Sequence, residues 1–203
     1  MKAAALVLTL VGLAAMANAQ LGRLEVRLGV AGVFNRTAIS SDGARRLEPT
    51  DSLDFLGSVR WHFSAMHSLE VNIGHTDNSQ IYSLSPNVFR ITTTVTEYSG
   101  AYVLSPRRGN RFEPFVFAGA GGLRFSPKNT LIDGLPALFG ATSQTSLAFL
   151  YGGGTEYRLW RVFNLRLEYR GLIYRNPDFS ITPLFTGSRG HMAEPAAGIV
   201  VKF

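Results

Sequence analysis

Residues 53–63, LDFLGSVRWHF, alternate between two kinds of side chain. One parity is apolar and largely aromatic: Leu53, Phe55, Val59, Trp61 and Phe63. The other parity is polar and partly ionic: Asp54, Ser58, Arg60 and His62. A period of two is typical of a β-strand whose two faces have different surroundings. This stretch therefore predicts a strand with an apolar environment on one side and a charged one on the other.

Working outward from this strand, the same alternation recurs and predicts eight strands, at approximately 24–35, 53–63, 68–77, 88–104, 112–125, 145–158, 163–174 and 191–203. The gaps between them are alternately long (36–52, 78–87, 126–144 and 175–190) and short (64–67, 105–111 and 159–162). Such connections are typical of antiparallel strands that cross a bilayer from a periplasmic start. The predicted fold is all-β: an eight-stranded antiparallel up-and-down transmembrane β-barrel with short periplasmic turns and long extracellular loops. The faces of the glycine-rich strand 112–125 stay unassigned.

The polar parity of these strands carries seven acids and six bases: Glu25, Asp54, Glu70, Glu97, Glu156, Glu168 and Glu194 against Arg27, Arg60, Arg158, Arg166, Arg170 and Lys202. A near balance suits a closed, narrow interior, because a buried ion that loses its partner costs about 3–5 kcal/mol. We therefore expect a charge network that plugs the lumen, formed by Glu25, Arg27, Asp54, Arg60, Glu70, Glu97, Glu156, Arg166, Glu168, Arg170, Glu194 and Lys202. An ordinary solvated sheet face is the alternative.

The first residues, MKAAALVLTLVGLAAMANAQ, have the pattern of a secretory signal peptide: one lysine, a short apolar stretch and an A-x-A site at Ala17–Ala19. We expect cleavage between Ala19 and Gln20, which leaves a signal peptide at 1–19 and one barrel domain at 20–203. The chain has no cysteine, which excludes disulfides and thiol chemistry. Its net charge of +6 suits a nucleic-acid partner, but export and the lack of long basic runs argue against one.

Four stretches resemble those of a known family: EPFVFAGAGGLRF (113–125), YGGGTEYRL (151–159), NLRLEYRG (164–171) and EPAAGIVVKF (194–203). In order and spacing they are similar to small outer-membrane β-barrels of the OmpA/OmpX and opacity-protein, porin-like kind. The resemblance implies a monomer in the outer membrane of a Gram-negative-type bacterium, in contact with outer-membrane lipid and lipopolysaccharide. It also implies that the outer-membrane assembly machinery reads Ile199, Val201 and Phe203 as an assembly signal, although Val201 stands where the family often has an aromatic residue.

The expected function is a structural or surface-interaction role: envelope integrity, adhesion or contact with a ligand through the extracellular loops. One alternative is a lipid-modifying hydrolase or acyltransferase, for which His75, Asp77, Ser79 and His191 are candidates. A polar rim that leads into a loop is the favoured explanation of those residues, because a triad is defined by geometry rather than by spacing, so no catalytic residue is assigned. A narrow small-solute pore is a second alternative. No spacing of His, Asp and Glu is typical of a metal site, so neither a metal nor a cofactor is expected.

Two further alternatives concern the fold and one loop. A soluble lipocalin-type barrel is disfavoured, because those barrels hold a ligand in an apolar interior and present polar residues outside. The stretch 129–144, within the long gap at 126–144, is unusually apolar, which indicates either an interaction site or a cover over the barrel mouth.

Because the resemblance implies that the terminal strand is a recognition signal, a short polar tail appended after Phe203 should impair insertion. Fractionation of cells that produce the extended and the native chain measures this. Equal amounts of both proteins in the membrane fraction would count against an assembly signal at this end.

Overall fold

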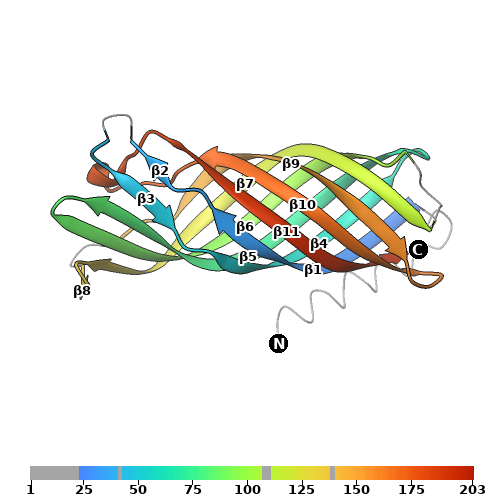
Figure 1. Cartoon of the computed structure of the whole chain (residues 1–203), viewed down its shortest axis with the longest axis horizontal. Coiled ribbons are helices and arrows are strands. Elements are labelled where there is room, and N and C mark those ends of the chain that lie inside the picture. The colour runs from blue at the N-terminus through green and yellow to red at the C-terminus, as the bar shows by residue number, and fades with distance from the viewer. Residues whose placement is uncertain (1–22, 41–42, 107–110, 138–139) are drawn as a thin grey trace.

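A computed structural model describes residues 23–40, 43–106, 111–137 and 140–203, and these form a closed antiparallel barrel (Figure 1). Eight long strands make its wall: β1 (Leu24–Asn35), β4 (Ser52–His62), β5 (His67–Leu84), β6 (Asn87–Leu104), β7 (Phe112–Ile132), β9 (Gln144–Arg158), β10 (Phe163–Arg175) and β11 (Arg189–Lys202). Each pairs with the next along the chain, and β1 pairs with β11 to close the ring. The expected eight-stranded up-and-down barrel is confirmed.

The two ends of the barrel differ in their connections (Figure 1). The long-loop end carries the short strands β2 (Ala38–Ile39), β3 (Arg46–Pro49) and β8 (Leu135–Pro136), and the 3-10 helix η2 (Thr182–Leu184). The short-turn end, opposite, holds the C-terminus. Within the part of the chain that the structure describes, no helix is long and apolar enough to cross a membrane.

The connection between β5 and β6 differs from the expected long loop at 78–87. β5 runs on to Leu84 and β6 begins at Asn87, so the two strands form one long hairpin. The alternation of buried and less buried residues continues through Gln80 and Tyr82, which gives the extension an inner face that can pack. β7 likewise continues to Ile132, which makes the start of the apolar 126–144 gap a strand.

The structure also assigns the faces of the glycine-rich strand β7. Its odd-numbered residues point inward, since Glu113, Phe115 and Phe125 are buried while Val116 is exposed. Phe117 belongs to the same inner face and lies over its cross-strand partner Gly152. A Cβ at Gly152 would lie 2.5 Å from that ring, so glycine gives the ring its place against the strand.

A matching pair holds the outer face of β9 to β10. Tyr151 lies across from Gly171, and a Cβ at Gly171 would lie 2.4 Å from the Tyr151 ring. An aromatic ring over a cross-strand glycine shields its backbone and fixes the register of the two strands. Gly152 of YGGGTEYRL and Gly171 of NLRLEYRG are therefore positions at which an aromatic ring packs on the strand.

The polarity of both faces reverses along the barrel. Toward the short-turn end the outward residues are apolar and the inward ones ionic, as on β4 and β10. Toward the long-loop end many outward residues of β5, β6, β7 and β9 are polar: His75, Asp77, Arg90, Thr92, Thr94, Thr96, Arg124, Lys128 and Thr145. Apolar inward residues form the main core there, beside buried polar residues such as Asn78, Gln80 and Thr93. The core residues are Val33, Leu47, Tyr82, Ile91, Val95, Leu123, Phe125, Leu150, Leu172, Tyr174, Phe179, Leu184 and Met192. We call the two interior regions the ionic zone and the apolar zone.

Aromatic side chains follow the same division. Around the short-turn end, Trp61, Phe63 and Tyr102 form a chain of ring contacts with centroids 5.9 and 6.3 Å apart. Phe89 of β6 packs against the core of the apolar zone, because the long hairpin carries it beyond the apolar outer surface.

The reversal predicts where an outward charge is tolerated when the barrel lies in a bilayer. Val71→Arg, in the apolar part of the outer face, should destabilise the barrel by about 2–4 kcal/mol, because the guanidinium then faces hydrocarbon. Thr92→Arg, in the polar part, should cost about 1 kcal/mol or less. Reversible urea unfolding in lipid vesicles measures both, and equal costs would show that the polar part is also immersed.

Candidate functional site

The centre of the ionic zone is a pair of buried arginines that reach from opposite walls to shared carboxylates. Arg60 of β4 donates from Nε to Oε2 of Glu70 at 2.8 Å and from Nη1 to Oε1 of Glu156 at 2.9 Å. Arg166 of β10 donates to the same Glu70 oxygen at 2.7 Å and to Glu168 at 2.8 Å. Both side chains are at most 3% exposed, so the ion pairs span the lumen in the absence of bulk water.

Aromatic packing supports these two arginines. The guanidinium carbons of Arg60 and Arg166 lie 4.9 and 4.3 Å from the ring centroid of Phe115 on β7. A cation over an aromatic face is favourable, and more so when both groups are desolvated. Phe115 thereby fills the remaining space of the lumen at this level.

Lys202 connects the closing strand to three other strands near the short-turn end. Its Nζ lies 2.6 Å from Glu113, 2.9 Å from Glu156 and 3.3 Å from Glu25. Nε2 of His62 lies 2.7 Å from the Glu25 carboxylate, and its Nδ1 lies 2.6 Å from the Ser68 hydroxyl. His62 is thus a member of the network with a partner on each ring nitrogen.

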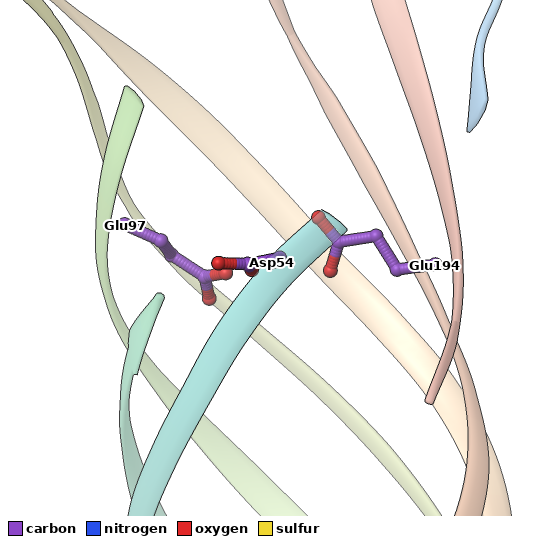
Figure 2. A group of neighbouring side chains, drawn as sticks. All are labelled: Asp54, Glu97 and Glu194. Carbon is purple, nitrogen blue, oxygen red and sulfur yellow. The ribbon is translucent and has the colours of Figure 1, made fainter. Parts of the chain in front are cut away.

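A second group of charges lies at the border with the apolar zone. Asp54 lies between Glu97 and Glu194, with the three carboxyl groups turned toward one another (Figure 2). Their oxygens lie within 4.8 Å of one another, although the residues come from β4, β6 and β11. Carboxylates this close could hold a cation.

In this structure the cation beside them is Arg170. Its Nη2 donates to both oxygens of Glu97 at 2.6 and 2.7 Å, and its Nη1 lies 3.3 Å from Glu194. Asp54 accepts a hydrogen bond from the backbone N–H of His75 at 2.6 Å. The guanidinium therefore occupies the role that a metal ion would have, and the carboxylates need it because charge repulsion would otherwise separate them.

The apolar zone is closed by residues 176–188, which we call the mouth segment. Phe179 and Leu184 are fully buried, and the ring of Phe179 meets those of Tyr82 and Phe125 edge to face at 6.4 and 6.5 Å. The backbone of Phe179 is left-handed, with φ of 53°, a conformation that needs firm support from its surroundings. Gln144 supplies part of it, because its Oε1 accepts hydrogen bonds from the N–H groups of Asp178 and Phe179 at 2.9 and 3.0 Å.

Among the residues that the structure describes, the mouth segment therefore supplies the cover over the barrel, with Ala141 and Thr142 beside it. The Tyr82 hydroxyl donates to the carbonyl of Pro177 at 2.5 Å, which joins the long hairpin to this cover. From the 126–144 stretch, Thr142 donates its N–H to the Phe179 carbonyl at 3.2 Å, and Ala141 packs against the core. Leu135 at the tip of that stretch is 71% exposed.

The structure places the twelve residues of the expected network on the inner face. Eleven of them are joined by the ion pairs above and by a contact between Arg27 and Glu168, whereas Asp54 is held by the hydrogen bond from His75. Glu113 is an additional member that sequence reasoning missed, because its strand could not be given faces. Arg158 lies at the rim, where it reaches Glu113 at 3.5 Å. Ile199, Val201 and Phe203 share the outward parity of β11. The expected cleavage site at Ala19 and Gln20 lies outside the described residues.

The candidate catalytic residues are outward and have partners of other kinds. The Asp77 carboxylate accepts from Lys128 at 2.9 Å and from Thr94 at 2.6 Å. The Ser79 hydroxyl lies 3.4 Å from that of Thr92, and His191 pairs with the Tyr151 hydroxyl at 2.8 Å. These contacts do not form the chain of nucleophile, base and orienting acid that a triad requires.

Comparison with known proteins agrees with this barrel architecture. The family described as "Outer membrane protein beta-barrel domain" matches residues 3–183. No curated protein sequence matches the chain. Among solved structures, the barrel is similar to Neisserial surface protein A (NspA), with 16% identity over 89% of this chain and 97% of that one, and a TM-score of 0.56.

Two other solved structures have a similar fold. Ail, the attachment invasion locus protein of Yersinia pestis, crystallised with the heparin analogue sucrose octasulfate, is 15% identical over 90% of this chain and 99% of that one, with a TM-score of 0.54. OprG of Pseudomonas aeruginosa is 14% identical over 91% and 97% of the two chains, with a TM-score of 0.57. At these identities the likeness concerns the fold.

The ion pairs of the ionic zone predict how single and combined substitutions change the free energy of unfolding of the barrel. Arg170→Met should destabilise the barrel by about 3–5 kcal/mol, because Glu97 and Glu194 lose their cation while remaining buried. Adding Glu97→Gln and Glu194→Gln to Arg170→Met should restore most of that loss. Urea unfolding in vesicles measures the series, with Arg46→Met as a control, since Arg46 makes an exposed pair with Glu48. A small effect of Arg170→Met would show that the carboxylates do not depend on it.

Proposed function

The chain belongs to the family of outer membrane protein β-barrel domains and lies in the outer membrane of a Gram-negative-type bacterium, and on that premise we propose that it acts as a closed, rigid platform that displays its outer loops. The observation that carries this proposal is an interior filled at two levels, by the ionic zone and by the apolar zone with its mouth segment. A barrel of eight strands has an interior that side chains can fill. The role is then structural or surface-interactive.

The filled interior argues against a pore. A solute would have to break the Arg60 and Arg166 ion pairs and also displace Phe179 and Leu184. Both layers are buried from solvent, so opening either one would break ion pairs or expose apolar side chains. Closure at two independent levels supports a barrel that does not conduct.

The part of the barrel with a polar outer face supports the display role. It is built like a water-soluble barrel, since Tyr82, Phe125 and Phe179 form a core inside a polar exterior. A packed core keeps the β5–β6 hairpin and the mouth segment in one arrangement beyond the apolar band. Rigid, projecting elements of this kind suit contact with a ligand or another surface.

The names of the similar structures agree with a surface role. NspA is described as a surface protein, and Ail as an attachment protein that binds a sulfated heparin analogue in its crystal. Adhesion through the loops is therefore one form that the proposed role can take.

The enzymatic alternative is less well supported by the site. His75, Asp77 and Ser79 share one outward face, but Lys128 and Thr94 hold the Asp77 carboxylate. Release of acyl chains from lipopolysaccharide or phospholipid by the reconstituted protein, lost in His75→Ala, would establish the enzyme and contradict the platform.

Closure can be tested by conductance in planar bilayers. The native barrel should show no stepwise conductance, because both zones block the lumen. Phe179→Ser with Leu184→Ser should stay silent, since the ionic zone remains. Arg60→Ser with Glu70→Ser should also stay silent, since the mouth segment remains. Steps should appear when all four substitutions are combined.

Each variant is first checked for folding by its electrophoretic mobility without heating. Regular steps from the native barrel would overturn the proposal in favour of a pore. Steps from either double variant alone would show that only one of the two levels closes the lumen.

A further inference from the structure

The two ends of the barrel differ in the acidic side chains that they expose. The described acids that are not buried all lie toward the long-loop end: Glu48, Asp51, Asp77, Asp133 and Asp178. Toward the short-turn end the acids are Glu25, Glu113 and Glu156, and all three are buried in the ionic zone. Within the part of the chain that the structure describes, the short-turn end therefore exposes no Asp or Glu side chain.

Four arginines are exposed at this same end. Arg23 directly precedes β1, Arg111 directly precedes β7, Arg158 ends β9, and Arg161 lies in the turn between β9 and β10. They occupy one continuous part of the ring, because β7, β9, β10, β11 and β1 are neighbours in that order. We call these four arginines the basic arc.

Backbone hydrogen bonds hold the members of the basic arc beside one another. The N–H of Arg158 donates to the carbonyl of Arg111 at 2.9 Å, so these two residues are direct neighbours. The N–H of Lys202 donates to the carbonyl of Val162 at 2.9 Å, which brings the turn that carries Arg161 beside the end of the closing strand. The arc is therefore a continuous edge of the barrel.

Three members of the basic arc have no carboxylate partner among the described residues. No ion pair is formed by Arg23, Arg111 or Arg161. Arg158 reaches Glu113 at 3.5 Å, at the rim of the ionic zone. The acids of the lumen thus neutralise at most one of the four exposed guanidinium groups.

The lack of exposed acids, rather than the lack of ion pairs, distinguishes the basic arc. Arg90 and Arg124, toward the long-loop end, also form no ion pair with a described carboxylate, but the exposed carboxylate of Asp77 lies on the same outer face. Around the basic arc the exposed side-chain charges have one sign. A surface of one sign attracts groups of the opposite sign.

Large apolar and aromatic side chains lie directly beside these cations. Trp160, which precedes Arg161 in its turn, is 74% exposed. The guanidinium carbon of Arg111 lies 5.1 Å from the ring centroid of Tyr157, an outward residue whose cross-strand partner Phe112 is 56% exposed. Tryptophan and tyrosine are favoured at the boundary between hydrocarbon and headgroups. A partner dissolved in the periplasm would leave these rings in water, whereas a bilayer covers them.

We propose that the basic arc binds the phosphate groups of anionic phospholipids in the periplasmic leaflet, in preference to zwitterionic phospholipids of the same leaflet. A guanidinium donates charge-assisted hydrogen bonds to phosphate oxygens. A zwitterionic headgroup carries its own ammonium group, which competes with arginine for that phosphate, whereas a headgroup such as glycerol does not. The apolar outer face is sufficient for general contact with lipid, and the basic arc adds selection by headgroup charge. The inference does not depend on whether the lumen conducts or on what the loops contact.

The two tryptophans of the chain provide a readout, because Trp160 lies in the basic arc and Trp61 can be replaced. The experiment uses the Trp61→Phe barrel folded in vesicles of phosphatidylcholine. Phosphatidylglycerol or phosphatidylcholine with the same brominated acyl chains is added at equal mole fraction, and quenching of Trp160 fluorescence gives their relative affinities. Phosphatidylglycerol should be preferred by about tenfold or more, since one basic residue near an anionic lipid surface contributes about fivefold. The preference should fall between about 0.05 M and about 0.5 M salt.

Substitution of the unpaired members should remove this preference. Arg23→Gln with Arg111→Gln and Arg161→Gln should make the two brominated lipids quench equally, and Arg158 is retained because it reaches Glu113. Folding of the triple variant is checked by its electrophoretic mobility without heating. Arg161→Gln alone should lose about fivefold of the preference, which gives a second measurement if the triple variant does not fold.

Arg90→Gln with Arg124→Gln is the matched control. It removes two exposed arginines without ion pairs from the other end of the barrel and lowers the net charge of the protein in the same direction. Quenching of Trp160 should keep its full preference for phosphatidylglycerol. A loss as large as that of the triple variant would assign the effect to the charge of the whole protein and overturn the proposal.

Other results would also overturn it. Equal quenching by the two lipids without any arginine substitution would show that the headgroup is not selected. A preference that survives both high salt and the triple variant would not come from the guanidinium groups. Absence of quenching by either lipid would place the turn outside the bilayer. Co-sedimentation with isolated peptidoglycan that the triple variant loses, together with equal quenching, would identify a polymer of the cell wall as the partner instead.

Discussion

Closure of β1 against β11 is the constraint on which the rest of this structure depends. A bilayer offers no partner to backbone N–H and C=O groups, so a sheet that crosses it must have no free edge. Once the ring of eight strands is closed, the inner parity of every strand faces a narrow space without bulk water. Each charge placed there must find its partner across the lumen, and Arg60, Arg166 and Lys202 do so by joining carboxylates from several strands. The ion network is therefore a consequence of the closed backbone as much as a support for it.

Alternation within single strands was sufficient to predict the strand number, their order and most inward residues, because the period of two is a local property. The convergence of Asp54, Glu97 and Glu194 could not be predicted in this way. These residues belong to three strands, and their proximity depends on the relative heights of those strands. Glu113 was missed for a different reason: the prolines and glycines of its strand gave no clear apolar parity, although Phe115 and Phe117 point inward with it.

The long-loop end was the least predictable part, also for a physical reason. Residues 78–87 contain turn formers and polar side chains, which is typical of a loop, yet they form a hairpin because Tyr82 can bury its ring against Phe179. The mouth segment has few local signals for burial, and Phe179 even adopts a left-handed backbone conformation. Packing between segments that are far apart in sequence decides the structure here, so local patterns carry little of the information.

The reversal of polarity has a consequence for how such sequences can be interpreted. On β5 the outward, odd-numbered residues are apolar at Leu69, Val71 and Ile73 and polar at His75, Asp77 and Ser79, although the strand has no break between them. A change from apolar to polar outward residues within an unbroken strand therefore indicates where the apolar outer surface of the barrel ends on that strand. In other barrel proteins the same change would distinguish, from the sequence alone, the strand segments with an apolar outer face from the segments that project beyond it. It would also show which half of each strand can be redesigned like a strand of a soluble protein, with a polar exterior around an apolar interior.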